Sequence, residues 1–159
     1  MDIHLAISTS LKWTGIEARM HLLFHILQRE ARMGRKRSIV IVDDDVDASQ
    51  MEKVILEKTG LYDVMVCNQG SEALEVIRNL QPDLVLLDIV MPDADGAEIA
   101  AEIREDKSLA STQVVFMTSL ISEQEMAQSS RAGGYPFIPK PVSSETLLKR
   151  VKGFFSFGN

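Results

Sequence analysis

The stretch Asp83-Leu84-Val85-Leu86-Leu87-Asp88, followed by Ile89-Val90-Met91-Pro92, decides the fold of this chain. Four consecutive apolar residues between two acids are typical of a strand covered on both faces, as in a parallel sheet. Asp88 then stands at the carboxyl end of the strand. Open parallel sheets bind ligands at this edge, so the position favours a functional carboxylate. The stretch alone is equally consistent with Asp88 as a cap of the following turn.

Apolar runs recur on both sides of this stretch and alternate with amphipathic segments. The further strands are predicted at 39–42, 62–66, 113–117 and 137–138, and the helices at 46–58, 70–80, 96–105, 122–131 and 143–155. In the first of these helices, the apolar face is predicted to consist of Val46, Met51, Val54, Ile55 and Leu56. Five strands alternating with five helices predict a three-layer α/β fold with a parallel sheet and right-handed crossovers.

Composition limits the functions that this chain of 159 residues can have. Residues 38–159 contain ten Lys or Arg and twenty Asp or Glu, so this acidic body would repel a phosphate backbone and we expect no nucleic-acid binding. One cysteine, Cys67, excludes an internal disulfide and thiolate zinc clusters. The chain has no apolar run long enough for a membrane span and no signal-peptide pattern, so we expect a cytoplasmic protein.

Residues 1–37 differ from the rest, with seven Lys or Arg and three Asp or Glu. The apolar residues between Ile16 and Leu27 have helical spacing, so we expect an N-terminal extension at 1–37 that is either a short amphipathic helix or disordered. Met33 resembles a natural chain start, so we expect no role in the fold for residues 1–32. The main domain is predicted at 38–156, and we expect no output domain after it.

Polar residues follow four of the predicted strands, where the carboxyl ends of a parallel sheet meet. They are Asp43 and Asp44, Asp88, Thr118 with Ser119, and Lys140 before Pro141. Three carboxylates this close need a cation among them, and oxygen ligands without Cys or His favour Mg²⁺ or Mn²⁺ over zinc. A divalent ion beside a carboxylate, with a lysine and a hydroxyl opposite, forms a pocket for a phosphoryl group.

These motifs together resemble the receiver domain of two-component response regulators. The residues that carry the resemblance are Val42-Asp43-Asp44-Asp45, Asp88-Ile89-Val90-Met91-Pro92 through Gly96, Thr118-Ser119 and Lys140-Pro141. The resemblance covers residues 38–156 and implies a flavodoxin-like (βα)5 fold with the strand order 2-1-3-4-5. It also implies that Asp88 accepts a phosphoryl group from a histidine kinase or a phosphotransfer protein.

The resemblance assigns roles to the other residues of the pocket. Asp43 and Asp44 would organise the metal ion, with Asp44, Asp88 and the backbone carbonyl of Val90 as its direct ligands. Thr118 and Lys140 would contact the phosphoryl group, and the bond between Lys140 and Pro141 would be cis. Phe137 matches the switch aromatic, so phosphorylation would change the face formed by the fourth helix, the fifth strand and the fifth helix, where a downstream protein would bind.

Two other functions compete with a stand-alone phosphorylated receiver. A phosphatase of the aspartyl-phosphate type uses similar groups, but its nucleophile follows the first strand in an Asp-x-Asp arrangement, whereas Asp88 follows the third. We therefore expect a protein that accepts a phosphoryl group without enzymatic turnover. The second alternative is a receiver-like interaction module that no longer depends on phosphorylation, although the intact acids, Thr118 and Lys140 argue against it.

Overall fold

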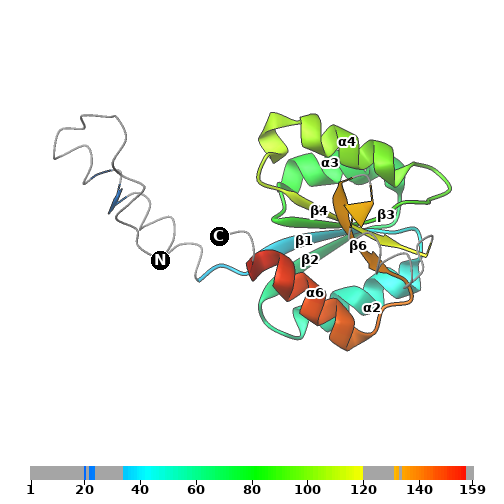
Figure 1. Cartoon of the computed structure of the whole chain (residues 1–159), viewed down its shortest axis with the longest axis horizontal. Helices are drawn as coiled ribbons and strands as arrows, with labels where there is room; N and C mark the ends of the chain where they lie inside the picture. Colours follow the sequence, from blue (N-terminus) through cyan, green and yellow to red (C-terminus); the bar gives the residue numbers. More distant parts are fainter. Residues whose placement is uncertain (1–19, 21, 24–33, 120–130, 133, 157–159) are drawn as a thin grey trace. The chain divides into compact units, whose positions relative to one another are not determined.

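The computed structural model describes residues 20, 22–23, 34–119, 131–132 and 134–156. The chain divides into two compact units, residues 1–35 and 36–159, and the second contains the fold described below (Figure 1). The predicted helix near residues 16–27 lies outside the described residues, apart from 20, 22 and 23, which are helical and exposed. Every helix within the described ranges is too short or too polar to span a bilayer.

One sheet, with the strand order β2-β1-β3-β4-β6-β5, forms the centre of the second unit. Its strands are β1 (Arg37–Val42), β2 (Tyr62–Cys67), β3 (Leu84–Asp88), β4 (Gln113–Thr118), β5 (Arg131–Ala132) and β6 (Tyr135–Pro139). All neighbours are parallel except β5 and β6, which are antiparallel. Numbered among themselves along the chain, the five parallel strands have the order 2-1-3-4-5, so the predicted flavodoxin-like order is confirmed.

The short strand β5 was not predicted. Ala132 pairs with Tyr135, so the two strands are joined by the two residues Gly133-Gly134. Gly134 has a φ of +90°, which glycine adopts without strain and which such tight hairpins require. Arg131, predicted as the end of a helix, therefore belongs to a strand, and residues 120–130 of that predicted helix lie outside the described residues.

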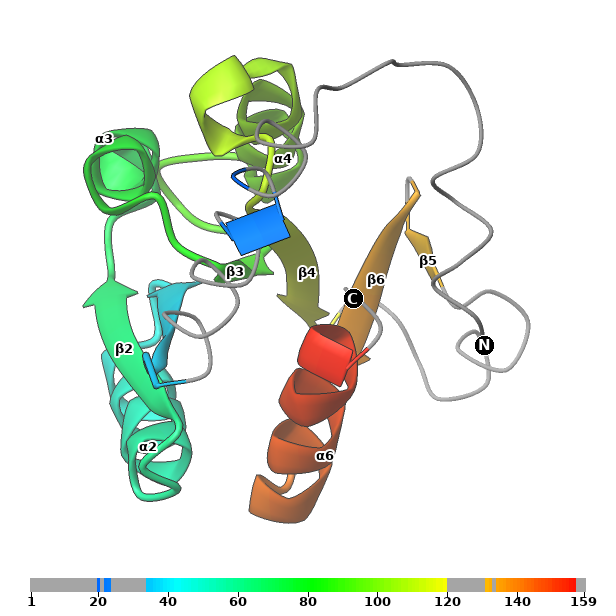
Figure 2. The same cartoon turned by 90° about the vertical axis from the view of Figure 1, so that its left-hand side faces the viewer.

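Helices cover both faces of the sheet, which gives the predicted three layers. They are α2 (Val46–Glu57), α3 (Gly70–Leu80), α4 (Gly96–Glu105) and α6 (Ser144–Ser156), with a short 3₁₀ turn at Lys107–Leu109. Figure 1 shows α3 and α4 on one face of the sheet and α2 and α6 on the other, and the view turned by 90° in Figure 2 separates the same two pairs.

The central strands are apolar at every position because both of their faces are covered. On β1, Val40 and Val42 belong to the core beneath α3 and α4, whereas Ile39 and Ile41 belong to the core beneath α2 and α6. The four apolar residues Leu84–Leu87 of β3 divide between the two cores in the same way. The run of apolar residues in β3 is therefore continuous because the strand is covered on both faces, as predicted.

The predicted apolar face of α2 is right for Leu56 and Ile55, which pack in the core beneath α2 and α6, and wrong for its other three residues. Val46, Met51 and Val54 are 53%, 66% and 48% exposed, whereas the buried residues of this helix are Ser49, Glu52 and Leu56. Positions 49, 52 and 56 follow helical spacing, so they form one stripe toward the sheet and α6. Two of them are polar, and for this reason hydrophobic periodicity placed the exposed Val46, Met51 and Val54 on the buried face.

Candidate functional site

The carboxyl ends of four parallel strands lie side by side at one edge of the sheet. Val42 pairs with Leu87, Asp88 with Met117, and Thr118 with Pro139. These pairs lie at the carboxyl ends of the strands. The residues at each strand end, or directly after it, therefore meet in space although they come from distant parts of the sequence. This register brings together Asp43, Asp88, Thr118 and Lys140, the residues predicted to form the site.

Three carboxyl groups gather at this edge. One oxygen each of Asp43, Asp44 and Asp88 lie within 4.8 Å of one another. Asp43 is only 1% exposed, whereas Asp44 is exposed and Asp88 is half-buried. The backbone N–H of Asp45 donates to Asp43 at 3.0 Å, and that of Val90 donates to Asp88 at 3.3 Å. Because like charges at this spacing repel, the cluster needs positive charge nearby.

Lys140 supplies one positive charge. Its Nζ donates to a carboxylate oxygen of Asp43 and, at 2.9 Å, to one of Asp88. Burial by itself would lower the pKa of Lys140, but the hydrogen bonds and charges of these two carboxylates outweigh burial and raise it. The side chain is therefore an ammonium at neutral pH. The peptide bond between Lys140 and Pro141 is cis, as the resemblance implies.

The negative charge that Lys140 leaves unneutralised in the carboxylate cluster suits a divalent cation. Three carboxylates and one ammonium leave a net charge of −2. Among the described residues, the cluster contains oxygen ligands and neither Cys nor His, which suits Mg²⁺ or Mn²⁺ better than zinc. The exposed carboxylate of Asp44 leaves one side of the cluster open to solvent. When bound, such an ion would neutralise negative charge on a phosphoryl group.

The loop between β3 and α4 carries Val90, whose carbonyl is the predicted backbone ligand. The N–H of Gly96 closes the loop by donating to the carbonyl of Ile89 at 2.8 Å. A Cβ at position 96 would lie 2.0 Å from the carbonyl oxygen of Asp88, so only glycine fits there. The glycine that ends the Asp88 motif is therefore needed for the shape of the loop.

Asp93 ties the same loop to the start of α3. Its carboxylate accepts the backbone N–H groups of Gly70 at 3.2 Å and Ser71 at 3.0 Å, and the Ser71 hydroxyl at 3.0 Å. The hydrogen bonds from Ser71 and Gly70 lower the pKa of Asp93. An acid in one loop thus caps the helix that follows another strand, and this helps to fix the segment that carries Val90.

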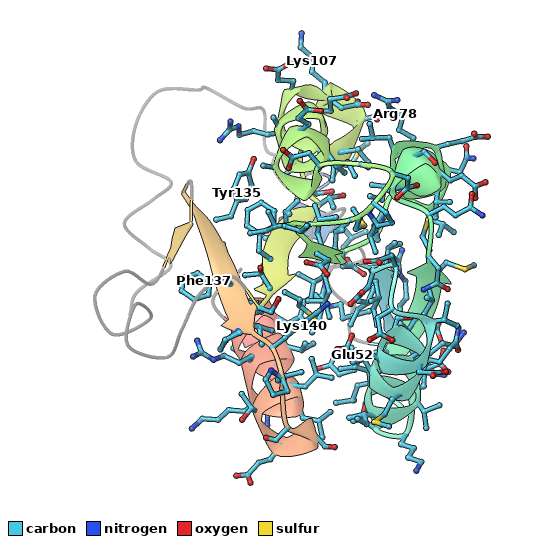
Figure 3. The ribbon with its side chains drawn as sticks, turned by 90° about the vertical axis from the view of Figure 1, so that its right-hand side faces the viewer. Glu52, Arg78, Lys107, Tyr135, Phe137 and Lys140 are labelled. Atoms are coloured by element: carbon cyan, nitrogen blue, oxygen red, sulfur yellow. The ribbon has the colours of Figure 1, made fainter. Side chains whose placement is uncertain are left out.

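Thr118 and Phe137 lie on the neighbouring strands β4 and β6. Thr118 is 1% exposed, and its carbonyl accepts the backbone N–H of Lys140 at 2.9 Å. Phe137 is 4% exposed and belongs to the core beneath α3 and α4, so the predicted switch ring is already buried in this structure. Figure 3 labels Phe137 on β6, Lys140 just beyond the end of this strand, and Tyr135 nearer to α4.

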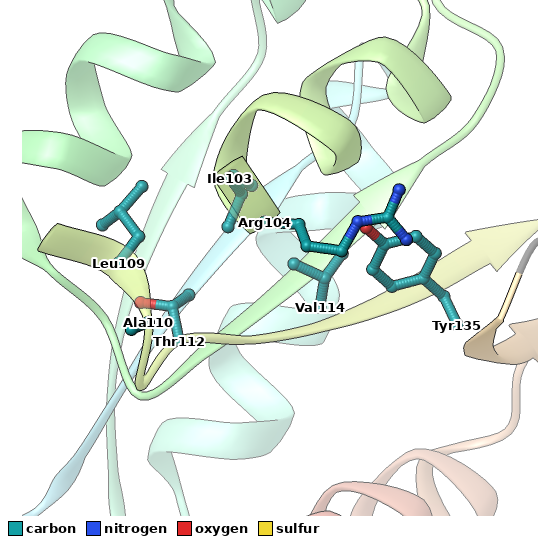
Figure 4. A pocket seen from close by; sticks show the side chains of 7 residues that line it. All are labelled: Ile103, Arg104, Leu109, Ala110, Thr112, Val114 and Tyr135. Carbon is teal, nitrogen blue, oxygen red and sulfur yellow. The ribbon is translucent and has the colours of Figure 1, made fainter. Parts of the chain in front are cut away.

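Tyr135, which the sequence did not single out, links β6 to α4. Its hydroxyl donates to the carbonyl of Ala100 at 2.9 Å, and its ring packs edge-on against Phe116. The guanidinium of Arg104 lies 5.4 Å from the centre of the ring. Tyr135 and Arg104 border a cavity of about 150 Å³, shown in Figure 4, away from the carboxylates. Tyr135 thus connects β6 to α4 by a hydrogen bond and by ring contacts.

Sequence reasoning missed two residues beside the carboxylates. Asn68, directly after β2, donates from one Nδ2 to the carbonyl of Asp43 at 2.7 Å and to the hydroxyl of Ser49 at 2.9 Å. Its place at the end of a parallel strand was a usable signal. Glu52 is buried on α2, where a helical acid is normally exposed, and no pattern in the sequence indicated this.

The fold and the site define an α/β protein with an acidic pocket at the carboxyl edge of a parallel sheet. The sequence profile of the response regulator receiver domain family matches residues 39–152. The chain therefore belongs to the response regulator receiver domain family.

Solved structures agree with this membership. The CheY-like receiver domain protein of Methanospirillum hungatei is 30% identical with a TM-score of 0.66, over 78% of this chain and 97% of that one. The BeF3-activated receiver domain of Klebsiella pneumoniae RstA is 34% identical with a TM-score of 0.61, over 72% and 95%. Chemotaxis protein CheY4 of Vibrio cholerae is 26% identical with a TM-score of 0.65, over 75% and 98%. Family membership supports a role in phosphorelay signalling.

Proposed function

We propose that the chain is a Mg²⁺-dependent phosphoacceptor in the cytoplasm, with Asp88 as the modified residue. The observation that carries this proposal is the pair of hydrogen bonds from Lys140 to Asp43 and Asp88 within a cluster of three carboxylates. Asp88 is the member at the end of the central strand β3, and it is half-buried, so a donor can reach it. Asp43, Asp44 and the carbonyl of Val90 would hold the metal ion together with Asp88.

In the proposed reaction, a carboxylate oxygen of Asp88 attacks the phosphorus of a phosphohistidine on a histidine kinase or a phosphotransfer protein. The phosphorus–nitrogen bond breaks, its electrons return to the imidazole, and an acyl phosphate forms on Asp88. Lys140 is already within hydrogen-bond distance of Asp88 and would pair with a phosphoryl oxygen. The hydroxyl of Thr118 would donate to another oxygen, and the protein itself would not turn over substrate.

The acyl phosphate adds charge next to β4 and β6, and we propose that this alters the face formed by residues 122–131, β6 and α6. A downstream protein would bind there. Phe137 is the residue of β6 that we expect to respond, because it lies between the phosphoryl-contacting end of the strand and the hairpin. Residues 122–130 of this face lie outside the described part of the chain.

Phosphorylation of the native chain by acetyl phosphate and Mg²⁺, measured by intact-protein mass spectrometry, tests the proposal. We expect one phosphoryl group per chain in the native protein and none in Asp88→Asn. The matched control is Asp47→Asn, an exposed acid in the first turn of α2. Labelling of Asp88→Asn at the native level, or a native chain that a competent donor leaves unmodified, would contradict the proposal and favour a phosphorylation-independent module.

A further inference from the structure

A second cavity lies between α2 and α6, next to the carboxylate cluster. Its volume is about 330 Å³, at the lower end of the range for small-molecule sites. Much of its lining is apolar or small: Ala48, Met51, Ile55, Pro141, Val142 and Leu147. Its polar lining includes the acids Asp45 and Glu52, with Lys140 and Ser119 on the side of the carboxylate cluster. In Figure 3, Glu52 is labelled on α2 and Lys140 near the end of β6.

Glu52 is the unusual group in this cavity. The side chain is 6% exposed, and among the described residues its Oε2 is buried without a hydrogen-bond partner. Burial, and next the charge of Asp43, raise the pKa of Glu52 to about 7. Lys140 lines the same cavity, but its ammonium is engaged by Asp43 and Asp88. A buried carboxylate without a counter-ion is costly. Among the described side chains, none supplies a hydrogen bond to Oε2 of Glu52.

The chemistry of the lining limits which cation can pair with Glu52. Within the described ranges, the carboxylates placed to share a metal ion are Asp43, Asp44 and Asp88, and Glu52 is not among them. A divalent cation at Glu52 would also face a lining that is largely apolar, whereas Mg²⁺ and Ca²⁺ need six or more oxygen ligands. A protonated nitrogen on an aliphatic chain matches both halves of the cavity, because the nitrogen pairs with Glu52 and the chain contacts Met51, Ile55 and Val142.

We propose that the cavity between α2 and α6 binds a small organic cation, a primary ammonium on a short aliphatic chain, with Glu52 as its counter-ion. The ammonium donates to the carboxylate of Glu52, and Asp45 adds a second negative charge to the lining. The aliphatic chain displaces water from the side of the cavity formed by Ile55, Val142 and Leu147. The ligand is a free small molecule, since the acid is enclosed and the volume is modest.

Titration of the full native chain with n-butylammonium chloride, followed by NMR chemical shifts and calorimetry, tests this binding. The buffer contains saturating MgCl₂, so that the carboxylate cluster does not compete for the amine, and its pH is 8, where Glu52 is mostly ionised. We expect saturable binding, with the largest shifts in α2 and α6. The neutral analogue n-butanol should bind at least about tenfold more weakly, because it lacks the charge-assisted hydrogen bond.

Two variants locate the binding. Glu52→Gln keeps the shape of the side chain and should weaken butylammonium binding at least about tenfold. Glu72→Gln, an exposed acid in the first turn of α3, should bind as the native chain does. Ala48→Leu narrows the cavity and should also weaken binding without changing its charge.

Equal binding by Glu52→Gln, equal binding of butanol, or the absence of saturable binding would overturn the proposal. A blocked Gly-Lys-Gly peptide that binds where free butylammonium does not would also overturn it, because the site would then serve a protein side chain. No phosphoryl donor is present, so these outcomes leave the phosphoacceptor role of Asp88 untouched.

Discussion

Lys140 balances the charge of two carboxylates that come from different strands. Its ammonium bonds Asp43, which is almost fully buried, and Asp88, which is partly open to solvent. Removing the cation of a buried ion pair is strongly destabilising, because it leaves a buried negative charge without compensation. The residue therefore matters for folding before any phosphoryl group arrives.

We predict that Lys140→Met destabilises the metal-free protein by about 3 kcal/mol, because Asp43 and Asp88 lose their shared cation. The loss should be smaller with saturating Mg²⁺, which supplies positive charge to the same carboxylates. Urea unfolding in EDTA and in MgCl₂ measures both values. The matched control is Lys36→Met, which removes an exposed pair with Asp63 and should cost less than about 1 kcal/mol. An equal loss with and without Mg²⁺ would contradict this account.

Through Glu52, the stability of the folded protein should fall as the pH rises. The pKa of Glu52 is raised from 4.5 to about 7 by burial and by Asp43, so the folded state holds a proton that the unfolded state releases. The favourable contribution is complete below pH 4.5 and is lost as the pH rises through 7, a difference of about 3 kcal/mol. We expect Glu52→Gln to lose much of this pH dependence and to be more stable than the native chain at pH 8.

Urea unfolding in EDTA between pH 4.5 and 8 measures the effect of Glu52→Gln. Glu72→Gln serves as the control, because Glu72 is exposed on another helix and should leave the pH profile unchanged. If Glu52→Gln keeps the native pH profile, Glu52 is not a buried acid with a raised pKa.

At the scale of elements, the loop between β3 and α4 depends on one close approach of the backbone. A Cβ at Gly96 would collide with the carbonyl of Asp88, whereas a Cβ at Gly153 in α6 would point into open space among the described residues. We predict that Gly96→Ala destabilises the protein by about 1–3 kcal/mol. Gly153→Ala should stabilise it by about 0.5–1 kcal/mol, because alanine loses less backbone entropy in a helix.

Thermal unfolding of the two alanine variants measures this contrast between Gly96 and Gly153. Because the loop also carries Val90, Gly96→Ala should in addition bind Mg²⁺ more weakly, which a titration of the folded variant detects. A Gly96→Ala protein with native stability and native Mg²⁺ affinity would show that the loop can move away from β3 at no cost.

At the scale of the whole molecule, Mg²⁺ should raise the stability of the fold. The three carboxylates converge only when β1 and β3 pair, so the folded state binds the ion and the unfolded chain does not. At a Mg²⁺ concentration one hundred times Kd, the expected gain is about 2.7 kcal/mol. Melting temperatures in MgCl₂, against NaCl of equal ionic strength, measure it. Asp44→Asn should lose most of the gain, and an equal gain in NaCl would indicate screening alone.

Most of the fold could be predicted from the sequence, because the apolar runs of the strands are long enough to be buried on both faces. The ranges 39–42, 84–88 and 113–117 match β1, β3 and β4 within two residues, and the helix predicted at 96–105 is α4 itself. The candidate site was predictable too, since Asp43, Asp88 and Lys140 each directly follow or end a parallel strand. Helix faces were harder, because two of the three buried residues of α2 are polar.

The sequence by itself determined the parallel sheet and the residues at its carboxyl edge, because strand burial and strand ends are local properties of the chain. Only the tertiary structure decided which charges meet: that Lys140 bonds both Asp43 and Asp88, that Asp93 caps α3, and that Glu52 is buried with no hydrogen-bond partner for its Oε2 in the described part of the chain. The reason is physical. Those contacts join residues from about 20 to nearly 100 positions apart, or depend on which side of a helix packs inward, and the packing of whole elements sets both.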